Sequence, residues 1–162
     1  VQNELMNGTS PSEVFVGDYA MEQQAVANFK KVLIMLLGTA AQQAMSGQLN
    51  LKTEQEILMN LADIITEIFN AESTLMRVMK IAASYPDKDI DLYNAILRTH
   101  LHDATSRVTK QATDAIASFV APEMQGAFIS GLRKFTKYPL QNVKENRRKI
   151  AGVLIAAGEY SL

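Results

Sequence analysis

Cysteine and tryptophan are both absent from this sequence of 162 residues, and aromatic residues make up only 7% of it. The lack of cysteine excludes a disulfide framework, a thiolate metal site and a cysteine nucleophile. It is also compatible with the reducing cytoplasm, where we expect the protein to be located. Strong charge is missing too: the formal net charge of −1 gives no reason to expect nucleic acid as a partner.

Long hydrophobic runs are also missing. No apolar run approaches the ~20 residues of a transmembrane helix, and no signal peptide is visible. We therefore expect no association with membranes. The sequence does not begin with methionine and opens on a polar stretch, so we expect it to be a fragment of a longer chain.

Aliphatic residues, alanine and methionine are abundant and recur at helical spacing, and the chain is long enough for one domain with a sizeable core. We predict an all-α fold, an antiparallel helical bundle of three long helices plus two shorter C-terminal helices. Residues 1–18 contain glycine, proline and short polar side chains without a sustained period, which indicates a linker or tether. Residues 19–162 should form a single helical-bundle domain.

The segment 53–84 is predicted to be the central helix of the bundle. Thr53 and Glu56 have the spacing of a capping box at its start. Two neighbouring columns follow at alternating steps of four and three residues: Ile57, Leu61, Ile64, Ile68, Ala71, Leu75, Val78 and Ala82, and then Leu58, Ala62, Ile65, Phe69, Glu72, Met76, Met79 and Ala83. Together they span an apolar arc of about 140°. So wide an arc predicts that this helix contacts two or more partners.

Turn and capping residues bound the other predicted helices, which cover 19–45, 89–120, 122 to just before 138, and 143–157. Pro86 ends the central helix because proline lacks the N–H and disfavours helical geometry in the residue before it. Pro122 suits a first helical turn. Asn142 can cap the last helix, and Gly158 can end it.

Glu72 is the strongest candidate for a functional residue. It lies in the apolar arc, where burying a charged side chain is energetically costly unless the charge is paired. Three interpretations are open: a buried structural charge paired with a basic residue of a neighbouring helix, a catalytic base, or an exposed residue at the edge. No second acid, nucleophile or cofactor loop accompanies it, so we favour the structural charge. We assign no catalytic and no cofactor-binding residue.

Histidine and glycine offer little more. His100 and His102 are two positions apart on one predicted helix, so they point about 200° from each other and cannot bind one metal together. We therefore predict no metal site. Gly126 and Gly131 match no phosphate-binding motif, and close approach of two helices is the explanation that we favour.

Basic residues gather near the C-terminus, where seven of the sixteen lie in a possible docking patch: Arg133, Lys134, Lys137, Lys144, Arg147, Arg148 and Lys149. The patch could be a solvated face that pairs with acids elsewhere in a larger assembly, a docking surface for an acidic partner or another domain, or a contact for phosphate or acyl-CoA. Nucleic acid is disfavoured, because no helix-turn-helix spacing or aromatic stacking pattern accompanies the charge.

Three blocks of sequence resemble a known family. They are EILMNLADI (56–64), AESTLMR (71–77), and GLRKFTK (131–137) with RRKIA (147–151). Their order and spacing are similar to those of the C-terminal extra domain of large acyl-CoA dehydrogenases, the bacterial relatives of the very-long-chain mitochondrial type. The resemblance covers roughly residue 19 to the end of the sequence.

The resemblance implies that the parent chain is an FAD-dependent acyl-CoA dehydrogenase of fatty acid β-oxidation. Its flavin-binding and catalytic residues would belong to an upstream core, so we expect this fragment itself to hold no cofactor and to be no enzyme. The implied partners are that catalytic core, further subunits of a homo-oligomer, and the parent's acyl-CoA substrate. Mitochondrial relatives have a membrane-associated segment near the start of this domain, but residues 1–18 are acidic and not amphipathic. The alternative is a free-standing helical interaction module that docks an acidic partner through residues 133–149.

Overall fold

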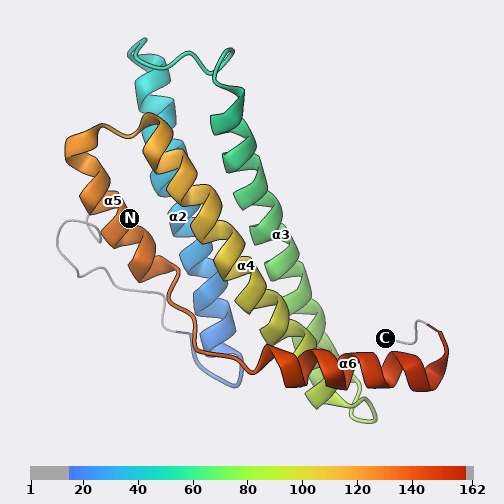
Figure 1. Ribbon diagram of the computed structural model, residues 1–162. Helices are drawn as coiled ribbons and strands as arrows, with labels where there is room; N and C mark the ends of the chain where they lie inside the picture. The colour runs from blue at the N-terminus through green and yellow to red at the C-terminus, as the bar shows by residue number, and fades with distance from the viewer. Residues whose placement is uncertain (1–14, 160–162) are drawn as a thin grey trace.

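The computed structural model describes residues 15–159, which form five α-helices and no strand (Figure 1). The helices are α2 (Ala20–Met45), α3 (Gln55–Ser84), α4 (Ile90–Phe119), α5 (Pro122–Phe135) and α6 (Val143–Ala157). The predicted all-α fold, with three long helices and two shorter C-terminal ones, is confirmed. Most of the predicted linker lies outside the described residues.

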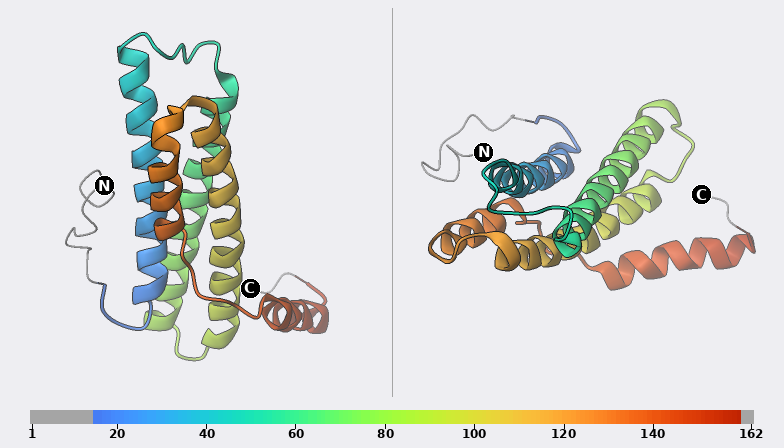
Figure 2. Two further views of the ribbon diagram at one scale, coloured as in Figure 1. Left: turned by 60° about the vertical axis from the view of Figure 1, so that its left-hand side comes forward. Right: turned by 90° about the horizontal axis from the view of Figure 1, so that it is seen from above.

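Helix α4 is the centre of the bundle. It packs against α2, α3, α5 and α6, whereas the main contacts of α3 within the described part of the chain are with α2 and α4. Helix α3 runs antiparallel to both α2 and α4, and α5 lies beside α2 and α4 (Figures 1 and 2). Helix α6 crosses the end of the bundle and projects beyond it (Figure 1). The prediction that the segment 53–84 forms the central helix is therefore wrong.

The reason lies in the side chains of α4. Its inner face buries six residues without any exposed surface: Leu97, Leu101, Ala104, Val108, Ala112 and Ala115. The alanines let neighbouring helices approach closely, and each leucine removed from water contributes about 1.5–3 kcal/mol. Because α4 packs against α2, α3 and α5, it is the helix that all three contact.

Helix α3 is only partly covered. Its first apolar column is buried from Ile57 to Val78, as predicted. The predicted contact with two or more partners is confirmed, because α2 and α4 both pack against α3. The second column is nevertheless exposed or half-buried: Leu58, Ala62, Ile65, Phe69, Met76 and Ala83 are exposed, while Glu72 and Met79 are half-buried. Ala82, the last residue of the first column, is exposed as well. The physical reason is that α2 and α4 pack mainly on the side of α3 that carries the first column, while α2 reaches the second column at Glu72 through Lys30.

The predicted cap at Asn142 and the predicted end at Gly158 are confirmed, and the structure adds a cap at Asp89. The Asp89 carboxylate accepts hydrogen bonds from the backbone N–H groups of Asp91 (3.0 Å) and Leu92 (3.2 Å), and the Asn142 side chain accepts one from Glu145 N–H (3.4 Å). Gly158 ends α6 with φ of 68°, a left-handed conformation that favours glycine.

The predicted capping box is wrong. The Thr53 hydroxyl donates to the carbonyl of Asn50 (3.0 Å), inside the turn that precedes the helix. Helix α3 begins at Gln55, and Glu54 at its N-cap makes no side-chain capping hydrogen bond. The chain between α2 and α3 thus satisfies its own polar groups before the helix starts, which leaves the Thr53 hydroxyl unavailable as a cap.

The two glycines of α5 differ. Gly131 is buried on the inner face of the helix, in line with the predicted close packing. Gly126 is exposed, and a Cβ built on it would meet nothing within 4 Å. Close approach of a helix therefore does not explain Gly126.

Candidate functional site

The first candidate site is a groove of about 400 Å³ between α2 and α3. Its lining is mainly apolar, and its residues are Phe15, Gln23, Val26, Ala27, Lys30, Glu72, Leu75, Met76 and Met79. The two helices touch along their buried faces but leave their outer edges apart. The groove lies along the C-terminal part of the second column of α3, where Glu72, Met76 and Met79 line it.

An ion pair bridges this groove. Lys30 Nζ on α2 donates to Glu72 Oε1 on α3 at 2.6 Å, and the two side chains are 45% and 42% exposed. Glu72 is thus half-buried rather than fully buried, and its partner on the neighbouring helix is a lysine. The pair neutralises both charges, and neither a nucleophile nor a histidine lines the groove beside it. The arrangement suits packing better than acid–base chemistry.

A second polar cluster, missed by the sequence analysis, lies near the start of α2. Glu22 is only 3% exposed, and its Oε1 accepts a hydrogen bond from Arg98 Nε of α4 at 3.3 Å. Burial, followed by the negative charge of Glu22, raises the pKa of the Tyr138 phenol to about 12. The signal was present in the sequence, because Glu22 lies four positions before Val26 and seven before Phe29, on the same helical stripe.

Beside this cluster, a pocket of about 400 Å³ lies where α2 begins and the turn from α3 to α4 passes. Asp18, Tyr19 and Asn94 contribute polar groups to its wall, with Lys88 and Arg98 as the cationic ones. The Tyr19 hydroxyl donates to Asn94 Oδ1 at 3.1 Å. Arg98 is paired with Glu22, and Lys88 lies over the ring of Tyr93 at 6.0 Å, so most of these groups already contact the chain itself. The pocket is therefore a junction between helices.

The two histidines do not form a metal site. His100 is half-buried, burial lowers its pKa, and its Nε2 has no hydrogen-bond partner among the described residues. Within residues 15–159, no group of three or more histidine, aspartate or glutamate side chains could hold a metal ion.

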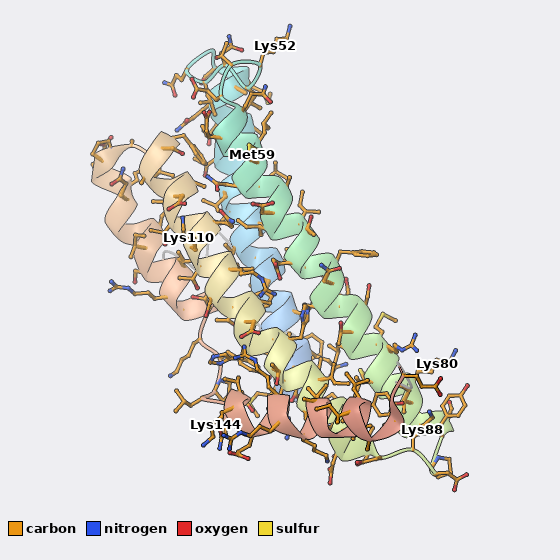
Figure 3. All side chains as sticks on the ribbon, turned by 45° about the vertical axis from the view of Figure 1, so that its right-hand side comes forward. Lys52, Met59, Lys80, Lys88, Lys110 and Lys144 are labelled. Carbon is orange, nitrogen blue, oxygen red and sulfur yellow. The ribbon has the colours of Figure 1, made fainter. Side chains whose placement is uncertain are left out.

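The structure divides the predicted basic patch between two helices. On α6, Arg147 donates to both carboxylate oxygens of Asp103 on α4 (2.9 and 2.8 Å), and Lys149 lies 3.6 Å from Asp89. Lys144, labelled near the start of α6 in Figure 3, and Arg148 both pair with Glu145 of the same helix.

The other three residues of the patch, Arg133, Lys134 and Lys137, are exposed at the end of α5 and form no ion pair within the described part of the chain. The α6 cations thus fasten α6 to the bundle and to itself. The α5 cations have no such ion pairs within the described residues.

In residues 15–159, no helix combines the length and the hydrophobicity that crossing a bilayer requires.

Fold and grooves together define a helical packing domain: its apolar faces are long, and most charges near its grooves are paired within the chain. The family described as acyl-CoA dehydrogenase, C-terminal domain, matches residues 28–134, which is more than half of the chain. The chain therefore belongs to this family, and the resemblance noted in its sequence is confirmed.

Two relatives show the same relationship. A probable acyl-CoA dehydrogenase of Bacillus subtilis is 29% identical over 165 residues, covering all of this chain and 27% of that protein. The crystal structure of an acyl-CoA dehydrogenase complexed with FAD from Bacillus anthracis superposes with a TM-score of 0.87 at 28% identity, over 99% of this chain and 27% of that one. The chain thus spans about a quarter of the length of these relatives.

Proposed function

We propose that this chain is the C-terminal helical domain of a longer FAD-dependent acyl-CoA dehydrogenase, in which it packs on the catalytic core. One observation carries the proposal: 99% of this chain superposes on about a quarter of a dehydrogenase that is complexed with FAD. In the parent, FAD and the acyl-CoA substrate would be bound by the remaining part, and the oxidation would belong to fatty acid β-oxidation in a bacterial cytoplasm.

The role of the domain would be mechanical. An uncovered apolar column on α3 and ion pairs that are already formed fit a surface that packs permanently against another part of the protein. By packing there, the domain would stabilise the core, influence the assembly of the homo-oligomer and shape the access of long acyl chains.

The test compares the parent protein with a parent from which this domain has been deleted. The intact parent should show the absorbance of bound flavin and oxidise acyl-CoA with an artificial electron acceptor. Deletion should lower the midpoint of thermal unfolding and change the oligomeric state in sedimentation velocity, while the domain by itself should carry no flavin. A parent without flavin, or flavin that co-purifies with the domain alone, would overturn the proposal.

A further inference from the structure

An uncovered apolar surface runs along α2 and α3 in the described part of the chain. On α3 it consists of Leu58, Ile65, Phe69 and Met76, and on α2 it includes Ile34 and Leu37, all of them exposed. From Leu58 to Met76 the stripe follows α3 for about 27 Å, since a helix rises about 1.5 Å per residue. We call these six residues the α2–α3 face.

Helical geometry places these side chains on one side of α3. Leu58, Ile65, Phe69 and Met76 recur at steps of seven, four and seven residues, which keeps them within about 40° of one another around the helix. The ion pair between Lys30 and Glu72 joins α2 to α3 along the same side, so Ile34, one turn after Lys30, lies beside the stripe. Exposed apolar side chains that gather into one stripe, rather than lying singly over the surface, are typical of an interaction surface.

We propose that the α2–α3 face is the surface through which this domain docks on the rest of its own parent chain. The inference rests on the proposed function and deepens it by naming the face that is used. About three quarters of each relative lies outside the region that this chain matches. In a parent of that length, the part that covers the face would be linked to this domain by the polypeptide chain itself. A tethered partner has a high effective concentration, which favours burial of an apolar surface within one molecule.

The chemistry of the face also favours a permanent intramolecular contact. Its only charges near the centre of the stripe, Lys30 and Glu72, are already bonded to each other at 2.6 Å. A preformed pair is easier to cover than a lone charge, which would be left buried without a partner. The basic patch is less suited to a permanent contact of this kind. Its cations on α6 already form ion pairs with acidic residues of the chain, and its cations at the end of α5 are exposed to solvent.

Two methionines of α3 provide a matched pair for the test. Met59 and Met76 are each 64% exposed, but they lie about 100° apart around the helix, and only Met76 belongs to the α2–α3 face. Figure 3 labels Met59 on the upper part of α3. If nothing covers the face, the two sulfurs should be oxidised at similar rates.

The experiment exposes the flavin-loaded parent protein briefly to hydrogen peroxide and quantifies both sulfoxides by mass spectrometry, with the urea-unfolded parent as the reference. We expect Met76 to be oxidised roughly tenfold more slowly than Met59 in the folded parent, because methionine oxidation follows exposure. Equal rates in a flavin-loaded parent would overturn the docking face and leave the proposed function intact. A flavin-free parent would instead count against the proposed function.

The occupant is identified by photo-crosslinking of the same parent with p-benzoylphenylalanine in place of Phe69. A crosslinked peptide from the flavin-binding part of the same chain would support the proposal. Peptides from residues 1–14, or crosslinks between subunits that disappear when the parent is diluted to monomers, would show a different occupant and overturn it.

Discussion

The carboxylate of Glu22 on α2 and the guanidinium of Arg98 on α4 are 76 positions apart in sequence, yet they form a hydrogen-bonded ion pair with Oε1 and Nε at 3.3 Å. The two side chains are unequal, because that of Glu22 is 4% exposed and that of Arg98 is 46% exposed. A buried carboxylate thus depends on a cation that reaches in from the surface, and it ties the start of α2 to α4.

Replacing Arg98 by leucine should therefore lower the free energy of unfolding by about 1–3 kcal/mol, the cost of leaving a buried polar group unsatisfied. The measurement is urea unfolding followed by circular dichroism. The double variant Glu22→Leu/Arg98→Leu removes the unpaired charge and should recover part of the loss. If the two single losses simply add in the double variant, the pair is not coupled as the structure indicates.

Ile64 and Ile65 are neighbours in sequence with opposite surroundings, 0% and 49% exposed. Ile64→Ala should cost about 2–5 kcal/mol of stability, since it opens a cavity against α2 and α4. Ile65→Ala should cost less than about 1 kcal/mol in this chain, because little is packed against it. Urea unfolding of both variants checks the contrast, and similar losses at the two positions would contradict the assignment of the buried column.

The N-cap of α4 offers a test with an internal control. Asp89→Ala removes an acceptor for two backbone N–H groups and the partner of Lys149, so stability should fall by about 0.5–2 kcal/mol. Thr53→Ala is the control before α3, where the hydroxyl caps nothing and a change within about 0.5 kcal/mol is expected. Thermal or urea unfolding should separate the two variants. A larger loss at Thr53 would restore the capping box that the structure does not show.

His100 should make stability depend on pH below neutrality. Burial lowers its pKa in the folded chain, with Glu67 and Asp103 acting against that shift and Arg107 reinforcing it. Below the unfolded value of about 6.5, the unfolded chain binds more protons at this residue than the folded chain does. The stability contributed by the neutral imidazole is therefore fully present above that pH and decreases as the pH falls.

His100→Gln should remove this dependence. In urea unfolding at pH 7.5 and 5.5, the free energy should decrease less for the variant than for the unmodified chain, and groups that titrate in both proteins cancel in the comparison. An equal decrease in the two proteins would show that His100 is protonated as readily in the folded as in the unfolded state.

Helix α6 contains no fully buried residue. Its attachment to the bundle therefore depends more on its ion pairs with α4 than on apolar packing. Arg147→Glu places a negative charge against Asp103 and should speed amide hydrogen exchange across residues 143–157 severalfold, with α3 unchanged. Arg148→Glu is the matched control, since Arg148 pairs only within α6, with Glu145. If Arg147→Glu leaves exchange in α6 unaltered but abolishes binding to an acidic partner, the free-standing docking module would gain support.

Local patterns in the sequence determined the helices of this protein, where most of them end, and which apolar stripes of each helix are available for packing. Backbone hydrogen bonds, proline geometry and the 3.6-residue period act over a few neighbours, so Pro122, Asn142 and Gly158 could be interpreted without a structure. The buried column from Ile57 to Val78 was predictable for the same reason.

Only the tertiary structure decided which apolar columns find a neighbour. The column from Leu58 to Met79 has nearly the same spacing as the buried one, yet it lies largely uncovered because α4, and not α3, is the helix that the others share. The sequence did not predict the ion-pair partners either: Glu72 pairs with Lys30, Glu22 with Arg98, and Arg147 with Asp103. Burial and pairing depend on residues that are distant in sequence, and helical periodicity carries no information about which helix lies opposite.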